Sequence, residues 1–195
     1  MKRLLSGGLI AAALAVPVFA QETTETSEDN AAAQADAAFP VLSAPAEGPQ
    51  PDAVFGGWEL RCVELQSNEK CVLTQFARTG EGEVLARLTM EALPDGAQGA
   101  AGITIVGPLG ILLPAGVTLQ IDDGRLNRYP FAVCERDGCL SRFGITETEV
   151  EVMKAGTNMT LGIVPAASNG DAIPLQISLA EFPAAWDALQ ERSPQ

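Results

Sequence analysis

Apolar and polar residues alternate with a period of two along several short stretches of the chain. In the stretch WELRC, residues 58–62, the apolar side chains fall on one face and two charged side chains on the other. The same alternation recurs in residues 83–91, 117–122 and 158–164, and it is typical of strands with one face in a core. Turn-forming residues separate these stretches. The pattern predicts a mainly β domain, an antiparallel sandwich or barrel.

A short helix is predicted for residues 144–156, GITETEVEVMKAG. Thr146 is a suitable N-cap, and Glu149 follows three residues later, which is the spacing of a capping box. Gly156 is a typical C-terminal stop. A strand is the alternative for residues 148–154, because two valines also alternate with charged residues there.

A second short helix is predicted for residues 180–192, AEFPAAWDALQER. Pro183 lies near its start, where proline is tolerated. Phe182, Trp186 and Leu189 recur at helical spacing, so one apolar face of this helix is expected to pack on the sheet.

Residues 96–121 carry no charged side chain over 26 positions, a length that could cross a membrane as a helix. Glycines and prolines interrupt this segment repeatedly, among them Gly102, Gly107, Pro108, Gly110, Pro114 and Gly116. They favour two buried strands joined by tight turns, so no membrane span is predicted. An exposed apolar loop at residues 106–116 that docks on a partner or on a membrane surface is an alternative.

The first twenty residues, MKRLLSGGLIAAALAVPVFA, predict an export signal. Two basic residues open it, an apolar run of residues 9–18 follows, and Val18 and Ala20 form a cleavage site before Gln21. The apolar run is too short for a membrane-spanning helix, which needs about 20 residues. We predict a mature protein in the periplasm, with secretion or a place at the cell surface as alternatives.

Residues 21–53 contain seven acidic residues and no basic one, among many Ala, Pro, Thr and Gln. Such a segment buries too little apolar surface to offset the entropy of ordering it, which predicts a disordered acidic tether. Residues 54–195 are then predicted to form one domain of ordinary size.

The whole chain has 12 basic and 25 acidic residues and a net charge of −13. An acidic domain without a basic cluster repels nucleic acid and anionic lipid, so neither is predicted as a partner. A cationic peptide or basic protein is the easier electrostatic partner, although acidity also serves solubility.

Four cysteines form an even set in a chain predicted to be exported: Cys62, Cys71, Cys134 and Cys139. Disulfides are the default in that setting. Three pairings are open, and loop entropy does not favour local pairs, because a long-range link would stabilise more. Turn geometry does favour them, since Asp137-Gly138 predicts a hairpin between the last two cysteines and a polar turn lies between the first two. We predict the disulfides Cys62–Cys71 and Cys134–Cys139.

A redox pair and a zinc site are the chemical alternatives for these cysteines. Catalytic redox pairs use C-x-x-C at the start of a helix, whereas four residues separate Cys134 from Cys139 and include Glu135 and Asp137. The spacings between the cysteines also fit zinc poorly. A structural role is therefore predicted, and a periplasmic thiol–disulfide redox factor using Cys134 and Cys139 is the alternative function.

The chain contains no histidine, which removes the usual general base and the commonest metal ligand. Asp122 and Asp123 are adjacent and would point to opposite faces of a strand, so they do not form a carboxylate pair. No catalytic residue, cofactor or metal is predicted. A candidate recognition patch is predicted from four arginines near the second cysteine pair: Arg125, Arg128, Arg136 and Arg142.

Five segments, in this order, resemble the invasion-associated locus B (IalB) family of alphaproteobacteria: WELRC, CVLTQ, LLPAGVTLQIDDG, YPFAVCERDGC and ISLAEFPAAWDAL. The resemblance runs from about Phe55 to Leu189 and includes all four cysteines. It implies an exported periplasmic or cell-envelope protein with an immunoglobulin-like β-sandwich. Pathogenic members are associated with host-cell invasion, but the family also occurs in free-living bacteria and offers no catalytic residues to carry over.

The predicted function is therefore that of an exported, non-enzymatic protein that binds a protein or an envelope component. Peripheral association with the envelope is part of this prediction.

Overall fold

The computed structural model describes residues 50–65 and 68–193. The predicted export signal and nearly all of the predicted tether lie outside these residues and stay predictions. The first strand begins at Ala53, the last residue of the predicted tether. In the described part of the chain, no helix is long and apolar enough to cross a membrane.

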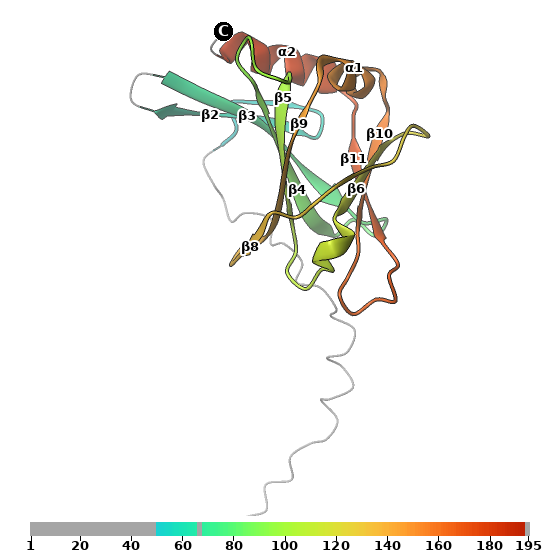
Figure 1. Cartoon of the computed structure of the whole chain (residues 1–195). Helices are drawn as coiled ribbons and strands as arrows, with labels where there is room; N and C mark the ends of the chain where they lie inside the picture. The colour runs from blue at the N-terminus through green and yellow to red at the C-terminus, as the bar shows by residue number, and fades with distance from the viewer. Residues whose placement is uncertain (1–49, 66–67, 194–195) are drawn as a thin grey trace, which may run out of the picture. The chain divides into compact units, whose positions relative to one another are not determined.

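The described residues contain eleven strands in one antiparallel sheet (Figure 1). The strands are β1 (Ala53–Phe55), β2 (Trp58–Leu65), β3 (Asn68–Arg78), β4 (Val84–Ala92), β5 (Ala101–Gly107), β6 (Val117–Ile121), β7 (Asn127–Tyr129), β8 (Val133–Glu135), β9 (Gly138–Ile145), β10 (Asn158–Ile163) and β11 (Ile173–Ser178). They pair in the order β7-β6-β10-β11-β3-β4-β5-β9-β8, and β2 and β1 extend from β3 beside this path.

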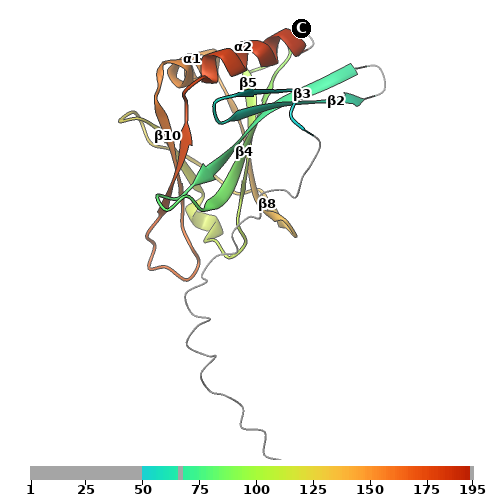
Figure 2. The same cartoon turned by 180° about the vertical axis from the view of Figure 1, so that it is seen from behind.

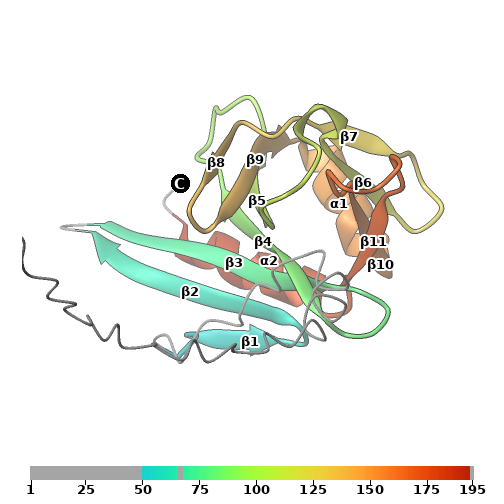
Figure 3. The same cartoon turned by 90° about the horizontal axis from the view of Figure 1, so that it is seen from below.

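The long strand β3 joins two halves of this sheet. One edge of β3 pairs with β4, and the other edge pairs first with β2 and then, through Arg78 and Gln176, with β11. The first half holds β2, β3, β4, β5, β9 and β8, and the second half holds β11, β10, β6 and β7. The two halves face each other across a shared core (Figure 3). The predicted mainly β, antiparallel, sandwich-like fold is confirmed.

Burial confirms the predicted alternation along the strands. Trp58 and Leu60 of β2 are buried, as are alternate apolar residues of β4, β6 and β10. Their inward side chains form one continuous apolar cluster drawn from both halves of the sheet. Burial of this surface is the main favourable contribution to folding.

Both predicted helices are present, at the same end of the sheet (Figure 2). Helix α1 (Glu147–Ala155) has the predicted capping box, because Thr146 Oγ1 accepts from Glu149 N at 3.3 Å and Glu149 Oε2 accepts from Thr146 N at 2.8 Å. Helix α2 (Phe182–Arg192) buries its apolar face, and Phe182 packs on Trp58 with ring centroids 5.0 Å apart. Helix α2 thereby covers one end of the core.

The charge-free segment forms two strands, β5 and β6, as predicted. Between them the 3-10 turn η2 (Leu113–Ala115) follows Ile111, which is buried and bridges to Pro165. Leu109, Leu112 and Leu113 are 41%, 41% and 47% exposed. The loop is thus anchored by Ile111 while it presents leucines to solvent, and its docking on a partner or on a membrane surface stays an untested alternative.

Both predicted disulfides are present, and each joins directly opposed residues of a hairpin. The Cα atoms are 4.0 Å apart in Cys62–Cys71 and 3.9 Å apart in Cys134–Cys139. In the second hairpin, the two-residue turn Arg136-Asp137 leads into Gly138 with φ +143°. A side chain at Gly138 would collide with the carbonyl oxygen of Gly107, so glycine is required there.

The capping box yields a stability prediction. We expect Thr146→Ala to lower the free energy of unfolding by about 1 kcal/mol, because the N-terminal amides of α1 lose an acceptor. Urea denaturation measures this change. The matched control is Thr148→Ala, two residues further along and inside α1. Ala is a better helix former than Thr there, and no capping hydrogen bond is lost. Equal stability of the Thr146→Ala variant and the unsubstituted protein would contradict the assigned cap.

Candidate functional site

The four arginines of the predicted recognition patch lie in different places. Arg125 follows β6 and lines a pocket, whereas Arg142 of β9 lines a separate groove. Arg128 lies in β7 opposite Thr118, and Arg136 lies in the turn between β8 and β9. The patch as a unit stays a prediction, and Arg125 lines the larger of these two cavities.

That cavity is a pocket of about 430 Å³ between the two halves of the sheet and α1. Six apolar residues line it: Ile103, Leu119, Ile121, Ile145, Val152 and Met153. Four side chains add polar groups: Arg125, Asn127, Tyr129 and Glu149. A largely apolar pocket of this volume with a few convergent polar groups is the usual form of a small-molecule site.

Tyr129 forms the side of the pocket where the ends of the sheet approach each other. Its ring stacks on Phe143 of β9 with centroids 3.5 Å apart and an interplanar angle of 5°. Burial raises the pKa of the Tyr129 phenol, the Glu149 carboxylate raises this pKa further, and the Arg125 guanidinium partly opposes them. At neutral pH the phenol is therefore protonated and available as a hydrogen-bond donor.

Glu149 reaches the pocket from the first turn of α1, where its carboxylate is already engaged. Its Oε2 atom accepts from Thr146 N at 2.8 Å and lies 2.9 Å from Thr146 Oγ1. The N-terminus of a helix also favours negative charge through the helix dipole. Much of the charge on Glu149 is therefore offset within α1.

Arg125 is placed by a turn that Asp122 fixes. The Asp122 carboxylate accepts from Thr157 N at 3.0 Å and from Asn158 N at 2.9 Å, which ties this turn to the start of β10. These backbone hydrogen bonds lower the pKa of Asp122. Asp122 has φ 45°, a left-handed conformation that Asp and Asn tolerate better than most residues.

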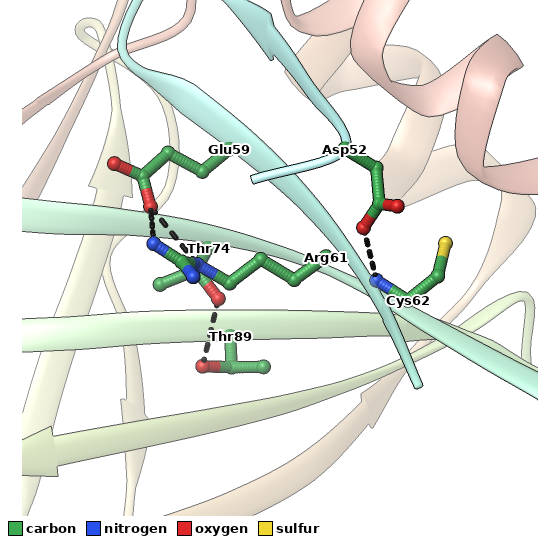
Figure 4. A network of polar contacts seen from close by, with 6 residues as sticks. All are labelled: Asp52, Glu59, Arg61, Cys62, Thr74 and Thr89. Carbon is green, nitrogen blue, oxygen red and sulfur yellow. Dashed lines mark hydrogen bonds and ion pairs between the residues drawn. The ribbon is translucent and has the colours of Figure 1, made fainter. Parts of the chain in front are cut away.

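A second, more polar groove of about 300 Å³ lies on the outer face of the first half. There the strand register aligns Glu59, Thr74, Thr89, Thr104 and Arg142 across five strands. Figure 4 shows part of this row: Arg61 pairs with Glu59 at 2.8 Å, and the hydroxyls of Thr74 and Thr89 are 3.5 Å apart. Because its exposed Lys70 is already paired with Glu91 at 2.6 Å and its apolar lining is limited to Val72 beside threonines and charged residues, this groove is the weaker candidate.

The cysteines offer no free thiolate in the oxidised protein. Cys62, Cys71 and Glu69 lie within metal-binding distance of one another, but the two sulfurs are bonded to each other. Cys134 and Cys139 lie on adjacent strands, away from the helix start that activates a catalytic thiol. The geometry therefore supports structural bridges and gives the redox alternative no specific support.

Sequence reasoning missed most of the pocket. Tyr129 is the only tyrosine of the chain, so it could have been noticed as a candidate site residue. Its stacking partner Phe143 belongs to another strand, so the sequence did not indicate that the two rings meet. Asn127 and Val152 carry no motif that would have marked them.

The fold and its two bridged hairpins define a disulfide-stapled, antiparallel β domain with a pocket beside helix α1. The sequence profile described as "Invasion associated locus B (IalB) protein" matches residues 58–190. The chain belongs to this family, and the resemblance found in its sequence motifs is confirmed.

Two curated relatives are invasion protein B homologues of Brucella abortus, from strain 2308 and from biovar 1 strain 9-941. Each is 29% identical to the chain over 139 residues, which cover 70% of this chain and 77% of the relative. The crystal structure of invasion associated protein B from Bartonella henselae matches with a TM-score of 0.62 and 21% identity, covering 71% of this chain and 94% of that chain. This last likeness shows the shared fold.

The Asp122 bonds predict a pH-dependent contribution to stability. Its folded-state pKa is lowered, so the carboxylate stabilises the protein above the unfolded-state pKa of about 4, and this contribution is lost as the pH falls through the folded-state pKa. We expect Asp122→Asn to be less stable than the unsubstituted protein at pH 7, with the difference shrinking below about pH 4. Urea denaturation across pH measures it. Asp123→Asn is the matched control, and a difference for Asp122→Asn that is constant with pH would contradict the assigned bonds.

Proposed function

We propose that the chain is an exported, non-enzymatic protein of the cell envelope that binds an envelope component in the pocket beside α1. The observation that carries this proposal is the apolar pocket of about 430 Å³ with polar groups from Arg125, Asn127, Tyr129 and Glu149. Concave, largely apolar cavities of this size with a few polar groups are where proteins usually bind small molecules. The presence of this pocket between otherwise well-buried strands supports a role in binding.

The chemistry of the pocket supports binding rather than catalysis. Tyr129 has a raised pKa, which makes the phenol a poor base at neutral pH. Glu149 is engaged as the capping-box carboxylate of α1, and the Arg125 guanidinium donates hydrogen bonds but has no acceptor atom. None of these side chains forms the pair of poised acid and base that general acid–base catalysis needs.

Export is supported by the two disulfides, because bridges of this kind form and persist in oxidising compartments. The basic start, apolar run and cleavage pattern of residues 1–20 support the same conclusion. The names of the relatives refer to invasion, but the site described above contains no feature specific to a host cell. We therefore propose an envelope role and leave host entry out of the proposal.

Export predicts the covalent state of the mature protein. The intact mass of protein purified from the periplasm should correspond to the loss of residues 1–20 and to two disulfides. Peptide mapping should then assign these disulfides as Cys62–Cys71 and Cys134–Cys139. The same measurement after reduction is the control. Retention of residues 1–20 would contradict export by a cleaved signal, and free thiols at Cys134 and Cys139 would revive the redox alternative.

Binding in the pocket predicts uptake of an apolar probe. The fluorescent probe N-phenyl-1-naphthylamine should bind the full mature chain, and Val152→Trp should weaken its binding at least about tenfold, because the larger side chain fills the pocket. Val152 lines the pocket and is 50% exposed, so this substitution need not disturb the core.

The matched control is Val63→Trp, at an exposed valine of β2 outside the pocket lining, which should leave probe binding unchanged. Equal binding by both variants would place the probe elsewhere, and absence of probe binding to the unsubstituted protein would contradict the proposed function.

A further inference from the structure

The pocket also carries information about the chemical class of its ligand, and this inference rests on the proposed function. Its apolar lining comes from four elements, β5, β6, β9 and α1. Ile103 and Ile145 belong to the first half of the sheet, and Leu119 belongs to the second. A ligand in this space would therefore present an apolar body to both halves.

The apolar surface continues out of the pocket. Val152 lines it and is 50% exposed. An exposed apolar side chain at a concave apolar pocket is typical of a binding site. It favours a ligand whose apolar part is longer than the enclosed space, as a flexible chain is.

Arg125 is the charge on the pocket that the described residues do not neutralise. It forms no hydrogen bond and no ion pair within residues 50–65 and 68–193. The acidic groups near it are engaged: Glu149 in the capping box and Asp122 with Thr157 N and Asn158 N. Asp123, in the same turn, is exposed and does not line the pocket.

Two neutral groups of the pocket add directional hydrogen bonds. The Tyr129 phenol is a donor while protonated, and the Asn127 amide both donates and accepts. A planar guanidinium matches the two oxygens of a carboxylate, with charge-assisted bonds about twice as strong as neutral ones. These donors favour an anionic head group.

We propose that the pocket binds a single-chain carboxylic acid, with its apolar chain against the isoleucines and leucines and its carboxylate against Arg125. The net acidity of the chain opposes long-range attraction of anions. Recognition of the carboxylate accordingly depends on direct contact with Arg125, an exposed residue of the pocket lining.

Three compounds that share one chain and differ in head group test this assignment: decanoate, decanol and decylamine. Each is titrated into the full mature protein at pH 7 as a competitor of bound N-phenyl-1-naphthylamine. Decanoate should compete best. Arg125→Gln should weaken decanoate about tenfold, which is the loss of one charge-assisted contact, and change decanol less than twofold.

Arg87→Gln, at an arginine on the outer face of β4 with no place in the pocket, is the matched control and should change neither compound. Decylamine competing best, or an unchanged ratio of decanoate to decanol in Arg125→Gln, would overturn the carboxylate assignment while probe binding upholds the pocket. Failure of the probe itself to bind would instead overturn the proposed function together with this inference.

Discussion

Apolar contact between the inner faces of the two halves of the sheet is the interaction on which the rest of this structure depends. In the described part of the chain, β3 and β11 connect the halves through one register pair, Arg78 and Gln176, and Tyr129 and Phe143 meet through side chains at the other side. Between these two points the halves are joined by buried side chains such as Leu88, Ile103 and Leu161. Hydrophobic burial is non-directional and scales with area, so the shape of these side chains decides how closely the halves approach.

The pocket lies where that contact is incomplete. Residues of β6 and β7 face residues of β5 and β9 there without pairing as strands, and α1 covers the gap with Val152 and Met153. The polar groups that fix this region have a structural role in the fold. Thr146 and Glu149 form the N-terminal cap of α1, and Asp122 holds the turn that carries Arg125. The same local bonds that complete the fold thereby position the polar side of the pocket.

The fold could be predicted from sequence wherever the signal was local. Period-two alternation located the strands, the spacing of Thr146 and Glu149 located α1, and turn residues between neighbouring cysteines located both bridges, which join opposed residues of hairpins. The pocket could not be predicted from sequence, because its lining combines residues of distant elements such as Ile103 and Met153.

The four arginines were grouped because they are close in sequence, but this does not place them on one surface. Successive side chains of a strand point to opposite faces, so β7 turns Tyr129 toward Phe143 and Arg128 away from it. Of the four arginines in the predicted patch, Arg125 alone lines this pocket.

The positions of the two disulfides determine which part of the protein a bound ligand would stabilise most. Cys62–Cys71 and Cys134–Cys139 each join neighbouring strands of the first half, so they restrict the hairpins and leave the junction between the halves without a disulfide. A ligand in the pocket would contact residues of both halves and bury apolar surface at a place where the halves do not pair as strands. Because a ligand that binds only the folded state stabilises it in proportion to the logarithm of its concentration over Kd, occupancy of the pocket would stabilise the junction that the disulfides do not hold. Binding and the integrity of the sandwich are in this way linked through the same apolar contact.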